Sequence, residues 1–130
     1  MAWKRPVEPT PQVDDTIAAL AARAAERLGA KAIITFTMSG STALRVAKFR
    51  PPVPIFAVTP SKGTRMKLSL SYGTITEQVA EVKDTDKMVA SVIRAARKRG
   101  IVKKGDTVVI TAGVPLWIVG KTNLLRVETV

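Results

Sequence analysis

The chain has 130 residues, of which 46% are apolar and 24% charged, so it is long enough for one hydrophobic core and too apolar for a disordered protein. It contains neither cysteine nor histidine, which excludes disulfide bonds, thiolate nucleophiles and the most common general base. Its formal net charge of +11 predicts a negatively charged partner: a phosphorylated metabolite, a nucleic acid or an acidic protein surface.

Carboxylates are the main metal-ligating side chains left, and most of the ten Asp and Glu residues, including Asp14 and Asp15, stand in contexts typical of a protein surface. We therefore expect no metal site, no cofactor and no catalytic residue. The sequence has no signal-peptide core and no uninterrupted apolar stretch of about 20 residues, the length that a membrane span needs. This predicts a cytoplasmic protein without membrane contact.

The first half of the chain predicts an arm followed by alternating helices and strands. Three prolines within residues 1–12 predict an extended arm or linker before a single domain over residues 13–130. A first helix is expected over 13–29, because apolar residues recur at helical spacing and Gly29 is a stop signal. The apolar, β-branched run 32–37 predicts a strand covered on both faces, and a polar turn follows it.

The next elements are defined by proline and by capping residues. A helix over 43–49 ends before two prolines, which disfavour helix in the residue that precedes them. A strand is expected over 55–59. Ser61 then serves as the N-cap or an early residue of a helix over 61–71.

The second half completes an α/β pattern. Residues 75–82 alternate loosely and predict a third strand, and residues 84–99 carry the clearest helix signal, with acidic residues at the start and basic residues at the end. Strands are expected over 107–111 and 124–130, with a loop over 113–120 between them. Together these elements predict a three-layer α/β/α sandwich around a five-stranded, mostly parallel sheet. The short connection to the last strand predicts antiparallel pairing at the sheet edge, which is open to a second copy of the chain.

The most informative segment is the turn Thr37-Met38-Ser39-Gly40-Ser41-Thr42, which has four hydroxyls beside a glycine and lies between a predicted strand and a predicted helix. Helix N-termini present free backbone N–H groups and the positive end of the helix dipole, so a phosphate would fit here. The same hydroxyls would also serve as helix caps, and both interpretations stay open. The turn lacks the Gly-Lys-Ser/Thr ending of a Walker A loop.

A second candidate segment follows the strand at 107–111, and in a parallel sheet it lies at the same edge as the first turn. Its candidate binding residues are Gly113, Trp117, Gly120, Lys121 and Thr122. Trp117 offers a flat stacking surface, and Lys121 offers a cation for phosphate. Loop packing or a subunit contact is the alternative for Trp117, and a solvated charge is the alternative for Lys121.

Several motifs follow one another in a recognisable order. They are residues 29–34, the turn at 37–42, residues 49–51 before 54–59, residues 103–106, and residues 111–115 with Gly120, Thr122 and Asn123. In order and spacing they resemble the C-terminal domain of pyruvate kinases, from about residue 13 to the end of the chain. The resemblance implies a regulatory, oligomer-forming domain of a glycolytic enzyme. Catalysis in that family belongs to a separate β/α barrel that these 130 residues do not contain, so the isolated chain should not be an enzyme.

The family's C-terminal domain holds the allosteric site, which implies roles for particular residues of this chain. Thr37, Ser39, Gly40, Ser41 and Thr42 would hold the phosphate of an effector, and the loop from Gly113 to Thr122 would close over the ligand.

Two departures narrow the expected effector. Relatives regulated by fructose bisphosphate hold its second phosphate with a tryptophan and an arginine, where this sequence has Glu81 and Met88. Their effector loop is also rich in glycine, whereas this one carries Leu116-Trp117-Ile118-Val119. A sugar monophosphate or AMP is therefore the expected effector.

Two other functions stay open. One is a free-standing domain that senses phosphorylated metabolites without a link to glycolysis. The other, less favoured, is a basic nucleic-acid-binding domain built on the positive charges of residues 94–104, although no DNA-reading motif or aromatic-interleaved basic stripe accompanies them.

Overall fold

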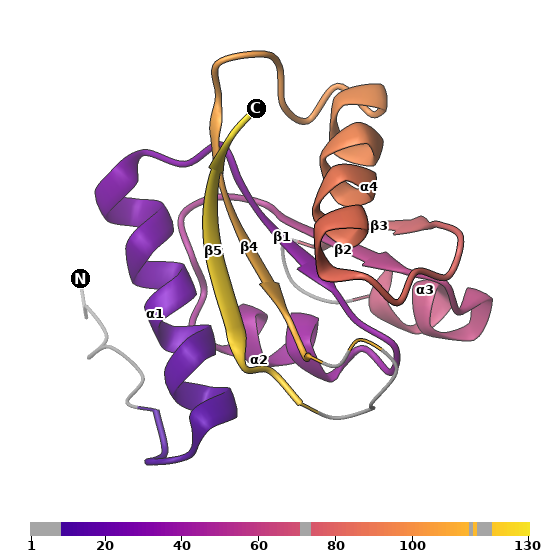
Figure 1. Cartoon of the computed structure of the whole chain (residues 1–130). Coiled ribbons are helices and arrows are strands. Elements are labelled where there is room, and N and C mark those ends of the chain that lie inside the picture. The colour runs from indigo at the N-terminus through magenta and orange to yellow at the C-terminus, as the bar shows by residue number, and fades with distance from the viewer. Residues whose placement is uncertain (1–8, 71–73, 115, 117–120) are drawn as a thin grey trace.

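The computed structural model describes residues 9–70, 74–114, 116 and 121–130 (Figure 1). Its strands are β1 (Ala32–Phe36), β2 (Ile55–Thr59), β3 (Thr74–Gln78), β4 (Thr107–Ala112) and β5 (Leu124–Thr129). Its helices are α1 (Val13–Leu28), α2 (Ser41–Lys48), α3 (Lys62–Leu68) and α4 (Thr85–Lys98). Within this part of the chain the strands form one sheet in the order β3-β2-β1-β4-β5.

The sheet is parallel except at one edge. Strand β1 lies at its centre, where Ile33 is opposite Ile55 of β2 on one side and Val109 of β4 on the other. Strand β3 extends the parallel part beyond β2, and β5 pairs antiparallel with β4. The predicted mostly parallel sheet with an antiparallel C-terminal edge strand is therefore confirmed.

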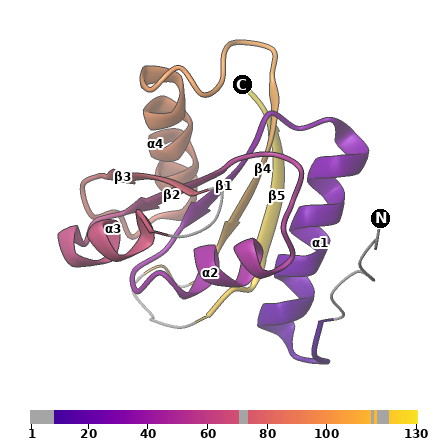
Figure 2. The same cartoon turned by 180° about the vertical axis from the view of Figure 1, so that it is seen from behind.

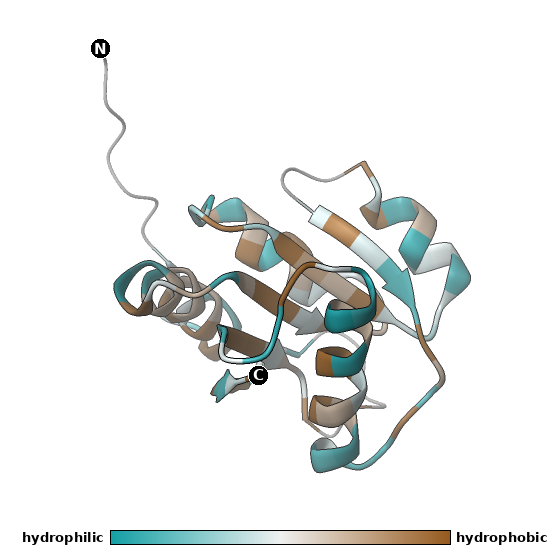
Figure 3. Cartoon of the chain, turned by 90° about the horizontal axis from the view of Figure 1, so that it is seen from above, coloured by the Kyte–Doolittle hydropathy of each residue, from teal (hydrophilic) through white to brown (hydrophobic). Residues whose placement is uncertain are grey.

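Helices cover both faces of the sheet, so successive side chains of the central strands are buried on opposite faces (Figures 1 and 2). Ile34 and Phe36 of β1 belong to the core cluster that includes the inner face of α4. Ile33, which precedes Ile34 and points to the opposite face of the sheet, belongs to the second cluster, which is formed with α1 and α2. Helix α3 lies on the same face of the sheet as α2, and its Leu68 packs with Ala43 of α2 and Ala57 of β2. The central strands are thus covered on both faces, and the predicted three-layer sandwich is confirmed. Figure 3 shows the apolar residues along the strands, between helices whose outer faces are polar.

The helix ends follow local chemistry. Ser61 is the N-cap of α3, as predicted, and its hydroxyl accepts a hydrogen bond from Thr64 N–H at 3.2 Å. Asp84 caps α4 in the same way, by accepting from Lys87 N–H at 3.1 Å. Helix α1 differs, because its N-cap is Gln12 without a side-chain cap.

Two predicted elements are shorter in the structure. The strand expected over 75–82 ends at Gln78, which pairs with Thr59, the last residue of β2. Strand β3 is an edge strand, so its length is set by its single neighbour and not by its own alternation. The helix expected over 61–71 ends at Leu68. In the described part of the chain, no helix has the length and apolar character to cross a bilayer.

Candidate functional site

The candidate site lies at the carboxyl end of β1, where the chain turns into α2 (Figure 2). Gly40 is the N-cap of α2 with φ 94° and ψ −8°, a left-handed conformation that glycine adopts most readily. Its N–H donates to the hydroxyl of Thr37 at 2.9 Å, and Ser41 N–H donates to Ser39 Oγ at 3.4 Å. The hydroxyl residues at positions 37 and 39 therefore shape the turn.

Helix α2 begins without a side-chain cap, because its N-cap residue is glycine. Its first turn also contains no acidic residue. The first N–H groups of the helix thus receive no oxygen from the N-cap side chain, and no carboxylate compensates the positive end of the helix dipole. An anion placed here would accept hydrogen bonds from these N–H groups and compensate the positive end of the helix dipole.

A hollow of about 10 Å³ lies beside this turn. It is lined by Phe36, Thr37, Met38, Ser41, Thr42, Gly113, Leu116 and Lys121. The two segments that the sequence singled out therefore meet at one place, as parallel strands require of the loops at their carboxyl ends. The volume admits about one water molecule, so the hollow would have to widen for a phosphate to enter.

Gly113 allows the two segments to meet. A Cβ at this position would overlap the backbone carbonyl of Lys121 and lie 2.9 Å from its carbonyl carbon. Only glycine permits so close an approach of two backbones. The loop that leaves β4 thereby runs against the segment that enters β5.

The predicted site residues divide into two groups. The hydroxyls of Thr42 and Thr122 lie 2.9 Å apart and hydrogen-bond to each other, and both residues are buried. Together with Thr37, whose hydroxyl holds the Gly40 N–H, they stabilise the site from within. Ser39 and Ser41 are half-buried and Lys121 is exposed, so these predicted side chains remain partly accessible to solvent. Trp117 and Gly120 lie outside the described residues.

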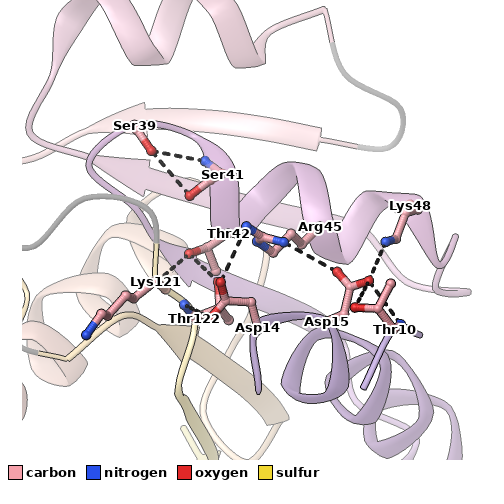
Figure 4. Close-up of polar contacts among 10 residues, drawn as sticks. All are labelled: Thr10, Asp14, Asp15, Ser39, Ser41, Thr42, Arg45, Lys48, Lys121 and Thr122. Atoms are coloured by element: carbon pink, nitrogen blue, oxygen red, sulfur yellow. Dashed lines mark hydrogen bonds and ion pairs between the residues drawn. The ribbon is translucent and has the colours of Figure 1, made fainter. Parts of the chain in front are cut away.

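An ionic cluster that the sequence did not predict lies between α2 and the start of α1 (Figure 4). Asp15 was expected at the surface but is 3% exposed, so that expectation is wrong. Its carboxylate accepts hydrogen bonds from Lys48 Nζ at 2.8 Å and from Thr10 N–H at 3.2 Å. The bond from Lys48 and then that from Thr10 lower the pKa of Asp15 from 3.8 to about 2. The sequence signal was two adjacent acids in a first turn, which indicates dipole compensation but not burial.

Arg45 joins this cluster to α1. Its guanidinium lies 3.4 Å from Asp14 and 3.4 Å from Asp15. Asp14 also accepts a hydrogen bond from the backbone N–H of Thr122 at 3.2 Å. Helix α1, helix α2 and the start of β5 are thus connected directly behind the hollow.

The described residues form no metal site at the hollow, and the largest groove described below lies elsewhere on the molecule. No group of three or more acidic side chains among the described residues is arranged to hold a metal ion. A groove of about 520 Å³ lies between α1 and the connection from α2 to β2, and Leu20, Arg23 and Phe49 are among its lining residues. None of the predicted binding residues lines that groove in the described part of the chain.

A family model described as the pyruvate kinase alpha/beta domain matches residues 15–128. The chain belongs to this family. The pyruvate kinase of Geobacillus stearothermophilus is 41% identical over 98% of this chain, and that of Clostridium acetobutylicum is 42% identical over 89% of it. A solved pyruvate kinase structure from Cryptosporidium parvum matches with a TM-score of 0.83 and 25% identity over 95% of this chain.

These matches cover only part of each relative. The chain spans 22% and 24% of the two bacterial enzymes and 24% of the Cryptosporidium chain. The resemblance to the C-terminal domain of pyruvate kinase is therefore confirmed. The described residues form this pyruvate kinase α/β domain alone, without the catalytic barrel of the homologous enzymes.

Proposed function

We propose that this pyruvate kinase α/β domain is a regulatory domain that binds a phosphorylated effector and acts with the catalytic barrel of a pyruvate kinase. The observation that carries the proposal is the uncapped N-terminus of α2, which meets Lys121 from the far end of the chain around one hollow. Backbone N–H groups, serine hydroxyls and an ammonium group are the donors that phosphate monoesters accept from.

The charge around the hollow supports an anionic ligand. Within the described residues, Lys121 forms no ion pair, and none of the residues that line the hollow is acidic. Ser39 and Ser41 stand beside the first turn of α2 with their hydroxyls 3.2 Å apart. A dianionic phosphate would therefore meet donors of both kinds, charged and neutral, with no carboxylate lining the hollow.

A single phosphate suits the site better than two. Met88, one of two positions where a second phosphate would need a partner, is fully buried in the core under α4. Glu81, the other, is an exposed residue of negative charge. Neither offers a cation, so a sugar monophosphate or AMP is the ligand class that we propose.

Self-association is the second part of the proposed role. Strand β5 pairs only with β4 in the described sheet, so the other edge of β5 is open. Val127, a residue of β5, is 42% exposed. An open edge with an exposed apolar side chain can extend the sheet with a second copy. Sedimentation should show dimers or larger species that Val127→Lys weakens, and a wild-type chain that stays monomeric at high concentration would argue against this part.

Calorimetric titration with AMP, ribose 5-phosphate and glucose 6-phosphate tests the proposed site. Ser41→Asp should abolish binding, because its carboxylate would occupy the N-terminus of α2 and repel the ligand while the helix remains stable. Lys121→Ala should weaken binding by about 1 to 3 kcal/mol, the cost of losing a hydrogen bond to a charged group.

Lys104→Ala is the matched control. It removes an exposed cation from the turn that enters β4, at the end of the strand opposite the hollow (Figure 1). Its affinity should equal that of the wild type. A Ser41→Asp chain that binds like the wild type would rule this site out, and the basic end of α4 would be the next candidate. The isolated chain should also form no ATP from phosphoenolpyruvate and ADP, since the phosphoryl-transfer residues of the barrel are not among its residues.

A further inference from the structure

Thr122 is held from two sides, by residues of α1 and α2 (Figure 4). Its backbone N–H donates to Asp14 Oδ1 at 3.2 Å, and its hydroxyl shares a 2.9 Å hydrogen bond with the hydroxyl of Thr42. The Thr42 hydroxyl also lies 3.4 Å from the backbone carbonyl of Lys121. Two consecutive residues of the segment that leads into β5 are thus attached to α1 and α2.

Asp14 is itself fixed in orientation. Its Oδ2 lies 3.4 Å from the guanidinium of Arg45, while its Oδ1 accepts from Thr122. Arg45 is held in turn by Asp15, which is buried and bonded to Lys48. One oxygen of the Asp14 carboxylate therefore pairs with Arg45 of α2, and the other accepts a hydrogen bond from Thr122, the residue after Lys121. These two interactions restrict the rotation of the Asp14 side chain.

The reach of Lys121 depends on this attachment. Its side chain is exposed, and it forms no ion pair within the described residues, so no other charge directs it. Lysine is a point charge on a four-carbon stem, and the volume that its ammonium samples is centred on its own backbone. A fixed backbone at Lys121 keeps that volume centred beside the hollow, which Lys121 lines together with Ser41 and Thr42.

We propose that Asp14 and Thr42 are positioning residues of the phosphate site, which hold the backbone of Lys121 so that its ammonium reaches an anion at the start of α2. This inference rests on the proposed function and adds to it a dependence of ligand affinity on α1. Because Asp14 belongs to the first turn of α1, any displacement of this helix displaces Lys121, and the bound ligand stabilises the attached position by the same free energy.

The test is a double-mutant cycle with ribose 5-phosphate as the probe. Asp14→Ala and Lys121→Ala should each weaken binding by about tenfold to a hundredfold, the equivalent of a lost hydrogen bond to a charged group. If Asp14 acts through Lys121, the double variant binds no more weakly than Lys121→Ala alone. Asp14→Asn should restore most of the affinity, because its amide oxygen still accepts from Thr122 N–H.

A second measurement follows the attachment without ligand. Amide hydrogen exchange at Thr122 should be about tenfold to a hundredfold faster in Asp14→Ala, and Asp14→Asn should bring it back towards the wild-type rate. Asp86→Ala is the matched control: it also removes a first-turn acid that pairs with an arginine at 3.4 Å, on a helix that does not line the hollow. It should change neither the affinity nor the exchange at Thr122.

The outcomes separate the two proposals. If the wild type binds and the losses from Asp14→Ala and Lys121→Ala add, or Asp14→Ala binds like the wild type, only the positioning role is overturned. Unchanged exchange at Thr122 in Asp14→Ala overturns it as well, whatever the affinities. A wild-type chain that binds no ribose 5-phosphate overturns the proposed function for this ligand, and the positioning role with it.

Discussion

Replacing Gly40 by alanine tests the backbone conformation on which the candidate turn depends. Gly40 has φ 94°, and a Cβ there would lie 3.2 Å from Leu68 Cδ2 and 3.5 Å from Thr64 Cγ2. Gly105 has the same φ of 94°, but a Cβ there would meet nothing within 4 Å. The variants Gly40→Ala and Gly105→Ala therefore share the backbone strain and differ in the side-chain contact.

The two contributions can be separated in magnitude. A left-handed conformation costs a residue with a side chain about 1 to 2 kcal/mol, which is the expected loss in unfolding free energy for Gly105→Ala. Leu68 is fully buried in the cluster that joins α2 and α3, so it cannot move aside without disturbing that packing. Crowding of this kind adds strain, and the expected total loss for Gly40→Ala is about 2 to 4 kcal/mol.

Urea denaturation followed by circular dichroism measures both losses under the same conditions. Gly40→Ala should also weaken binding of ribose 5-phosphate, since the turn at Gly40 presents the first N–H groups of α2. Gly105→Ala should bind normally. Equal losses of stability in the two variants would refute the role of the Leu68 contact. Two variants as stable as the wild type would refute the argument from backbone strain.

Three further predictions concern residues around the site. The pKa of Asp15 is lowered to about 2, chiefly by the hydrogen bond from Lys48. The charged carboxylate therefore stabilises the fold above pH about 4, and this stabilisation is lost as the pH falls towards about 2. Asp15→Asn should flatten the pH dependence of urea unfolding in that window. Thr35 is fully buried, and its hydroxyl has no hydrogen-bond partner among the described residues. Thr35→Val should therefore leave the midpoint of thermal unfolding unchanged or raise it. A lower midpoint would contradict this prediction. Gly113→Ala should lower the free energy of unfolding by about 3 kcal/mol or more, because its Cβ would overlap the backbone carbonyl of Lys121, which cannot move aside as a flexible side chain can. A smaller loss in urea denaturation would contradict this close approach of the two backbones.

Several elements could be predicted because their signals are local. The strands at Ala32–Phe36 and Ile55–Thr59 are short, apolar runs whose every residue is buried, as the sequence pattern indicated. Ser61 was recognisable as a cap because its partner, Thr64 N–H, is three residues away. The end of β3 at Gln78 was not, because it depends on where the neighbouring β2 ends.

The candidate site shows the same division. The turn at residues 37–42 and the cation Lys121 could be chosen from the order of strands and helices, because loops that follow parallel strands share one edge. Which hydroxyls already have a partner inside the protein could not be predicted, since the Thr42 hydroxyl is hydrogen-bonded to that of Thr122, a residue 80 positions later. The burial of Asp15 was equally hidden, because it requires Arg45 and Lys48 from another helix.

The sequence by itself determined the order of the elements, the class of the fold and the family, because hydrophobic periodicity, helix-end residues and colinear motifs are all properties of neighbours along the chain. Only the tertiary structure decided that Asp14 reaches the N–H of Thr122, 108 positions away, and that Asp15 is buried beneath α2. A carboxylate in the first turn of a helix satisfies the helix dipole whether or not anything packs against it. Its partners are selected by how α1 and α2 lie on the sheet, and no local pattern encodes that arrangement.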